Sequence, residues 1–165
     1  MTVSVPFAVE CFADLDVFLV LRDDAKLPFV KVHSFSQGEV VNDLLVRGKA
    51  QIGLVDEDPG KSHHGHRDDM DVVATTTDVE LRRGRGKLAD RHLLLLKPDL
   101  EGCFRRSLKL VGMQAPADDL HRALALPNAR HPHHVRFREQ LAELRKHPNS
   151  FIATVERELR KLFAR

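Results

Sequence analysis

The sequence predicts an α/β protein in which a mainly parallel sheet is flanked by helices and followed by a helical C-terminal extension. Short apolar segments alternate with amphipathic segments of helical period through the first two thirds of the chain, as a parallel sheet with crossover helices requires. The last third has helical periodicity. Because 165 residues fill one domain of common size, we expect an α/β domain over 1–112 with the helical extension, 113–165, packed on it.

The first part of the chain predicts two strands, each followed by a helix. Residues 3–9 are rich in β-branched and aromatic side chains, which favours a strand, and residues 14–24 place apolar side chains at helical spacing. Residues 29–35 alternate as a strand does, and residues 38–48 again collect apolar side chains on one helical face.

The middle of the chain predicts three further strands. Residues 52–55 form a short apolar run closed by the turn-forming residues 56–60, which indicates a buried strand ending in a loop. Residues 72–77 and 92–96 are the other two strand candidates, and the basic segment 80–87 separates them.

The remainder of the chain predicts helices. Asp99 is suited to cap a helix that runs to about residue 111. A later helix carries three apolar residues on one face, Phe137, Leu141 and Leu144. Asn149 or Ser150 can open the last helix.

Composition excludes several classes of protein. The longest purely apolar run, 93–96, is too short to span a bilayer, and residues 1–10 have no Lys or Arg before a hydrophobic stretch, so we expect no membrane insertion and no secretory signal. Cys11 and Cys103 are the only cysteines, which argues against a disulfide framework or a cysteine zinc site. A cytoplasmic location is the simplest expectation.

Acidic residues follow three of the predicted strands. Glu10 comes after the first strand, Asp56 and Asp58 after the third, and Asp99 with Glu101 after the last. The carboxyl ends of parallel strands lie along one edge of a sheet, so these residues are expected to converge there. Alternation puts Asp56 and Asp58 on the same side, where two carboxylates could bind one Mg²⁺ or Mn²⁺. Such an ion would neutralise phosphate charge and activate water.

The segments around these acids resemble a Toprim (topoisomerase/primase) domain. They read VECFAD at 9–14, GLVDED at 53–58 and LKPDLE at 96–101, and the resemblance extends from residue 3 to about residue 111. The pattern is most similar to that of the overcoming-lysogenisation-defect nucleases. One departure is Cys11, which stands where these motifs commonly have glycine after the glutamate.

The resemblance implies a role for each matched residue. Glu10 and Asp14 would belong to the active centre, and Asp56 and Asp58 would bind metal, with Glu10 as a further ligand or a general acid or base. A second metal position would use Asp99 and Glu101, and a basic catalytic residue before a C-terminal helix would be Lys146. Relatives often carry an attached ATPase; since this chain has no room for one, an ATPase partner would be a separate polypeptide.

The basic segment predicts contact with phosphates. Arg82, Arg83, Arg85, Lys87 and Arg91 lie close together in the sequence, around two glycines that permit a tight turn. The alternative is a solvated hairpin tip. The net charge of +2 creates no global attraction for a polyanion, so nucleic-acid binding would depend on how the charges are distributed.

Other motifs have simpler interpretations. Residues 60–62 read GKS, but the first glycine that a phosphate-binding loop requires would fall at Val55, so we reject that loop. The polar, His-rich residues 61–71 predict a mobile loop, and His63, His64 and His66 are better explained as solvated than as metal ligands; the same caution applies to His131, His133 and His134. Asp14 could instead be an exposed carboxylate that favours the first turn of a helix.

The sequence therefore predicts a divalent-metal-dependent phosphodiester hydrolase acting on DNA or RNA. The resemblance suggests the nuclease subunit of a multi-component bacterial system such as phage defence. Two alternatives stay open: a non-catalytic Toprim-like subunit that binds nucleic acid or a partner protein, and a phosphoryl-transfer enzyme of primase type.

Overall fold

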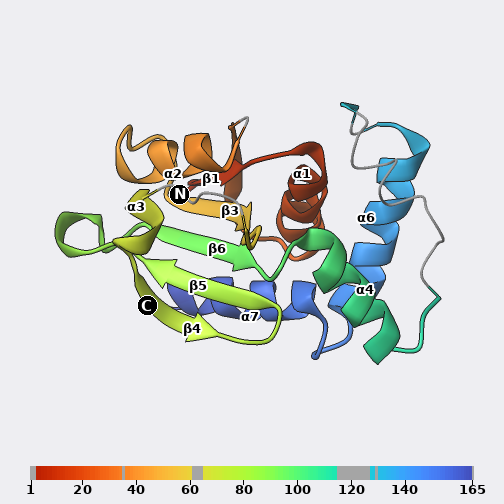
Figure 1. The fold of residues 1–165 in the computed structure, drawn as a ribbon. Helices are drawn as coiled ribbons and strands as arrows, with labels where there is room; N and C mark the ends of the chain where they lie inside the picture. Colours follow the sequence, from red (N-terminus) through yellow and green to blue (C-terminus); the bar gives the residue numbers. More distant parts are fainter. Residues whose placement is uncertain (1–2, 35, 61–64, 115–126, 129, 165) are drawn as a thin grey trace.

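A six-stranded, mostly parallel sheet forms the centre of the molecule, with helices on both faces (Figure 1). The computed structural model describes residues 3–34, 36–60, 65–114, 127–128 and 130–164. The strands are β1 (Val5–Val9), β2 (Phe29–His33), β3 (Ile52–Asp56), β4 (Asp71–Thr75), β5 (Val79–Arg83) and β6 (His92–Leu96). The helices are α1 (Phe12–Leu19), α2 (Gln37–Leu45), α3 (Gly65–Asp68), α4 (Leu100–Leu110), α6 (Pro132–Arg145) and α7 (Phe151–Phe163), with a π-helical turn, Val20–Asp24, after α1 and a 3₁₀ turn, Gly86–Leu88, before β6.

The strand order is β2-β1-β3-β6-β5-β4. The pairs β1 with β2, β1 with β3 and β3 with β6 are parallel, whereas β5 pairs antiparallel with both β6 and β4. The chain passes from β1 to one side to form β2 and then crosses to the other side to form β3. This reversal creates a topological switch point at the carboxyl ends of β1 and β3, where open α/β sheets form their binding sites.

Two apolar cores lie on opposite faces of the sheet. One contains side chains of α1, α4, α6 and α7 packed against β1, β3, β5 and β6. The other contains Val40, Val41 and Leu44 of α2 packed against the opposite face of β1, β3 and β6. Gly53 permits this close approach, because a Cβ atom there would lie 2.7 Å from Cγ1 of Val40.

The predicted α/β architecture is confirmed, and the helix caps follow from local chemistry. The side chain of Ser150 accepts a hydrogen bond from the Ala153 amide at the start of α7, and Ser36 accepts one from the Glu39 amide at the start of α2. Helices α6 and α7 pack against α1, α4 and the sheet, so the C-terminal helices share the main core. Among the described helices, none is long and apolar enough to cross a membrane.

One expectation about the middle of the chain was wrong, and a second, the mobility of residues 61–71, stays a prediction. Part of the basic segment forms strand β5, in which Val79 and Leu81 are buried and Glu80 and Arg82 face outward. Its strand pattern is weak because its outer face is charged. Within the expected mobile loop 61–71, residues 61–64 lie outside the described part, but Gly65–Asp68 form helix α3 and Met70 is buried in the second core.

Candidate metal centre

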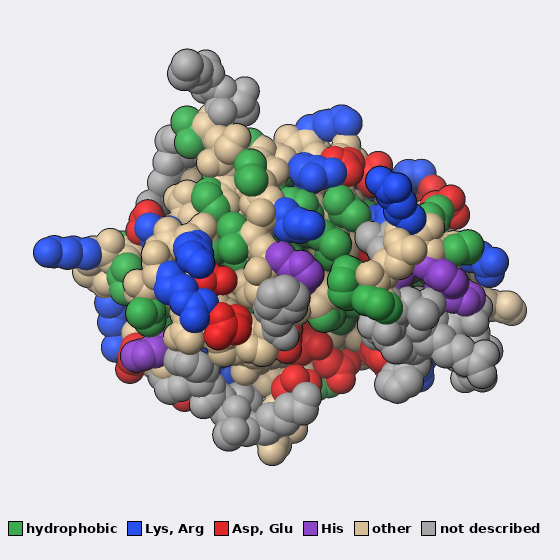
Figure 2. Space-filling model, turned by 90° about the horizontal axis from the view of Figure 1, so that it is seen from above, with side chains coloured by type: hydrophobic (Ala, Val, Ile, Leu, Met, Phe, Trp, Pro, Cys, Tyr) green, Lys and Arg blue, Asp and Glu red, His purple; other side chains and the backbone are tan. Residues whose placement is uncertain are grey.

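The acidic residues predicted from the strand ends lie at the switch point. Glu10 directly follows β1, Asp56 is the last residue of β3, and β1 and β3 are neighbours in the sheet. Asp99 immediately precedes α4, beside the end of β6. Figure 2 shows acidic side chains gathered into a group on the surface.

Asp56 is the central carboxylate of this cluster. Its Oδ1 accepts a hydrogen bond of 2.8 Å from the Leu100 amide at the start of α4. Burial is the main cause that raises the pKa of Asp56 to about 7, and the negative charges of Glu10, Asp58 and Asp99 also raise it. The hydrogen bond from Leu100 has the opposite effect and lowers the pKa. The four carboxylates therefore interact electrostatically, although three separate segments of the chain supply them.

Asp14 lies in the first turn of α1, and only 1% of its surface is exposed. Neither of its carboxylate oxygens has a hydrogen-bond partner among the described residues. Burial, followed by the charges of Asp56 and Glu10, raises the pKa of Asp14 well above its usual range, and Cys11 offsets only part of this effect. Asp14 is thus not an exposed carboxylate that merely favours a helix start.

Cys11 stands at the N-cap of α1 without a side-chain cap hydrogen bond. Burial and the charge of Asp14 raise the pKa of its thiol well above the ordinary value. The thiol therefore stays protonated at neutral pH and is a poor nucleophile.

Asp58 adopts a left-handed backbone conformation, with φ of 47°, in the loop after β3. Its amide donates a 3.0 Å hydrogen bond to the Pro98 carbonyl, which attaches this loop to the segment that follows β6. The alternation of side chains along an extended strand therefore ends before Asp58. Its negative charge nevertheless raises the pKa of Asp56. A strained backbone at such a position is typical of functional sites.

Asp99 and Glu101 lie at the start of α4, on the same end of the sheet. Oδ1 of Asp99 accepts a 2.7 Å hydrogen bond from the Gly102 amide, so the expected helix cap is present. Glu101 is half-buried in the first turn of α4. A role for either residue at a second metal position remains a prediction.

The donor set suits a hard divalent cation in chemistry and charge. Carboxylate oxygens are the preferred ligands of Mg²⁺, and both buried oxygens of Asp14 lack a hydrogen-bond partner among the described residues. Among the residues that the structure describes, however, no three His, Cys, Asp or Glu side chains have the arrangement that holds a metal ion.

The predicted phosphate-binding residues lie at the other end of the sheet. Arg83 pairs with His92 at the start of β6, whereas Val79 pairs with Leu96 beside the acidic cluster. Four residues of strand correspond to roughly 13 Å. Several of these cations are also engaged, because Arg82 pairs with Glu80, Arg85 pairs with Asp71, and Arg91 donates to the Ala50 carbonyl.

Lys146 is the C-cap residue that follows α6, at the surface. Its Nζ lies 2.6 Å from Oε1 of Glu143, and the two side chains are both exposed. The structure pairs Lys146 with a neighbour on its own helix, and its catalytic role stays a prediction.

Of the histidines, His63 and His64 lie outside the described residues, and His66 is exposed beside Asp69. His134 is different, because both it and Asp16 are fully buried and hydrogen-bonded to each other between α6 and α1. Arg138 donates a 2.7 Å hydrogen bond to the other oxygen of Asp16. Sequence patterns missed this network, although the i and i+4 spacing of His134 and Arg138 on one helix was available as a signal.

Replacing His134 with alanine should lower the free energy of unfolding by about 3 kcal/mol, because it leaves the buried Asp16 carboxylate with one partner fewer. Burial raises the pKa of Asp16 even with both partners present, so the carboxylate depends on their hydrogen bonds. Urea unfolding measures the effect, with exposed His147→Ala as the matched control. Equal stability of the two variants would show that the network contributes nothing.

Compared with known proteins, the chain matches no family model, no curated protein and no solved structure. The fold and the acidic cluster define its class as an α/β protein with a carboxylate-rich site at the switch point of its sheet. Assignment to the Toprim class remains a proposal.

Proposed function

We propose that this chain is a Toprim-like, divalent-metal-dependent phosphodiester hydrolase acting on DNA or RNA. The observation that carries the proposal is the convergence of Glu10, Asp14 and Asp56 at the switch point, where the charges of Glu10 and Asp56 raise the pKa of Asp14 and the charge of Glu10 raises that of Asp56. Acidic groups that repel each other in a partly buried site are compensated when a cation binds.

Glu10, Asp56 and Asp58 would hold the ion, with Asp14 behind them. When bound, Mg²⁺ or Mn²⁺ would neutralise phosphate charge and make water acidic enough to attack. The Leu100 amide holds one oxygen of Asp56 and thereby orients the carboxylate. Glu10 is half-buried and can exchange protons with a water molecule, as a general base requires.

A second candidate function is a non-catalytic subunit that binds nucleic acid or a partner protein. The observation that favours it is the lack, among the described residues, of three side chains already placed as metal ligands. The notion of a separate ATPase partner and a role in phage defence rests on the sequence resemblance.

Incubation of labelled single-stranded DNA, duplex DNA and RNA with the chain tests the proposal. We expect cleavage of at least one substrate in Mg²⁺ or Mn²⁺, and none in EDTA. Saturable binding without cleavage under any metal condition would favour the non-catalytic subunit. Cleavage that persists undiminished in EDTA would contradict metal dependence.

A further inference from the structure

A cavity of about 710 Å³ lies between α4, the turn that joins β4 to β5, and the beginning of α7. Its lining includes the threonines at 76, 77 and 154 and two cationic side chains, Arg106 and Lys109. These are groups that donate hydrogen bonds to anionic oxygens. None of them belongs to the candidate metal centre.

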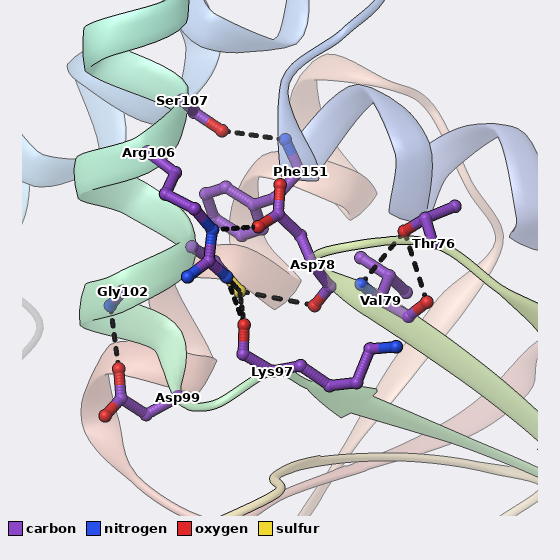
Figure 3. A network of polar contacts seen from close by, with 10 residues as sticks. Thr76, Asp78, Val79, Lys97, Asp99, Gly102, Arg106, Ser107 and Phe151 are labelled. Carbon is purple, nitrogen blue, oxygen red and sulfur yellow. Dashed lines mark hydrogen bonds and ion pairs between the residues drawn. The ribbon is translucent and has the colours of Figure 1, made fainter.

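The loop 97–99 contacts residues of both the cavity and the acidic cluster. On the cavity side, Nε of Arg106 is 2.5 Å from Oδ1 of Asp78, and the guanidinium also donates to the Lys97 carbonyl. Figure 3 shows Arg106 reaching from α4 to Asp78 and to this loop, with Asp99 farther along it. On the other side, the Asp58 amide donates to the Pro98 carbonyl. This loop therefore links the cavity to the acidic cluster.

Positive charge is available along this route. Lys109 is exposed and has no ion-pair partner in the part of the chain that the structure describes. Nζ of Lys97 lies 2.8 Å from Oγ1 of Thr75, a neutral acceptor that leaves the charge uncompensated. The third cation, Arg106, is paired with the carboxylate of Asp78. Helix α7 also begins here, and its dipole adds partial positive charge.

The segment 82–91 is less suitable for the same ligand. It lies at the far end of β5, and the charges of Arg82 and Arg85 are compensated by neighbouring carboxylates. Compensated cations release few counterions when nucleic acid binds, so they contribute little affinity.

We propose that this cavity, with Lys109 in its lining and Lys97 held beside it at Thr75, binds the phosphodiester backbone of nucleic acid that extends from the candidate metal centre. The inference rests on the proposed function and adds the direction in which the substrate lies. The contacts are to backbone phosphates, so they position the strand without selecting a base sequence.

The test compares two double variants of the full chain that each lose two positive charges. One is Lys97→Ala with Lys109→Ala, and the control is Arg83→Ala with Lys87→Ala at the other end of the sheet. Binding of labelled DNA and RNA oligonucleotides is measured by fluorescence anisotropy against salt concentration, in EDTA, so that no cleavage occurs. We expect the first variant to weaken binding on the order of tenfold and to reduce the salt slope by about 2, with less than about a twofold change in the control.

Charge-preserving variants separate charge from folding. Lys97→Arg with Lys109→Arg should bind like the wild type, and if the double alanine variant does not fold, the exposed Lys109→Gln alone should reduce the slope by about 1. Equal losses in both double variants, a larger loss in the control, or no binding by the wild type would each overturn the proposal. If the Lys97 and Lys109 variant binds more weakly but the wild type does not cleave in the presence of metal, the proposal that the cavity binds nucleic acid stands. The proposal that the chain is a hydrolase is then rejected.

Discussion

Replacing Asp58 with asparagine is expected to reduce metal-dependent cleavage by about a thousandfold or more while leaving nucleic-acid binding intact. Asparagine keeps the size of the side chain but loses the negative charge that a divalent ion requires. Binding should stay equal or become slightly stronger, because one negative charge near the polyanion is removed. Cleavage rates at fixed Mg²⁺ and anisotropy in EDTA separate the two effects.

Glu57→Gln is the matched control for this prediction. Glu57 lies between Asp56 and Asp58, and its backbone amide and carbonyl bond to Leu96 and Arg67. Because the proposed ligand set does not include its side chain, the variant should cleave within about threefold of the wild type. If Asp58→Asn cleaves as fast as Glu57→Gln, Asp58 is not a ligand and the metal centre is wrongly placed.

Replacing Asp56 with asparagine is expected to increase the free energy of unfolding above pH 7, by at most about 4 kcal/mol. The pKa of Asp56 is about 7 in the folded chain and 3.8 as its ordinary value. Below about pH 4 the Asp56 carboxyl group is protonated in both the folded and the unfolded chain, so its ionisation does not change the free energy of unfolding. As the pH rises from about 4 to 7, ionisation favours the unfolded chain, so stability falls; asparagine removes this loss and still accepts the Leu100 hydrogen bond.

Denaturant unfolding at a series of pH values measures this effect, and Mg²⁺ provides a second readout. The ion should stabilise the wild type at pH 8, by about 2.7 kcal/mol at a concentration one hundred times its dissociation constant, and should stabilise Asp56→Asn much less. Asp90→Asn, at the opposite end of the sheet, should respond like the wild type. A pH dependence between 4 and 7 that is unchanged in Asp56→Asn would show that Asp56 does not carry the charge repulsion.

The two predictions examine different properties of the same cluster. Loss of cleavage in Asp58→Asn depends on a metal ion and a substrate, whereas the stability of Asp56→Asn depends only on repulsion among carboxylates that the structure brings together. A protein that shows the second effect without the first would have the acidic cluster but not the activity. The non-catalytic subunit would then be the better explanation.

The sequence by itself determined the parts of this protein that depend on nearby residues. Apolar runs such as 52–55 and 92–96 predict buried strands wherever they occur, and Asp99 and Ser150 cap helices through hydrogen bonds to amides three residues later. The placement of Glu10 and Asp56 after neighbouring parallel strands then follows from the geometry of the sheet.

Only the tertiary structure decided features that depend on distant pairing. The antiparallel pairing of β5 with β6 places Arg83 beside His92, at the start of β6. The basic segment and the acidic residues therefore lie at opposite ends of the sheet, although each is close to a strand end in the sequence. The burial of Asp16 requires a helix from the last third of the chain to cover α1, and its partner His134 is 118 residues away. Local patterns contain no information about such contacts, because their energies arise only when the packed helices exclude water from both groups.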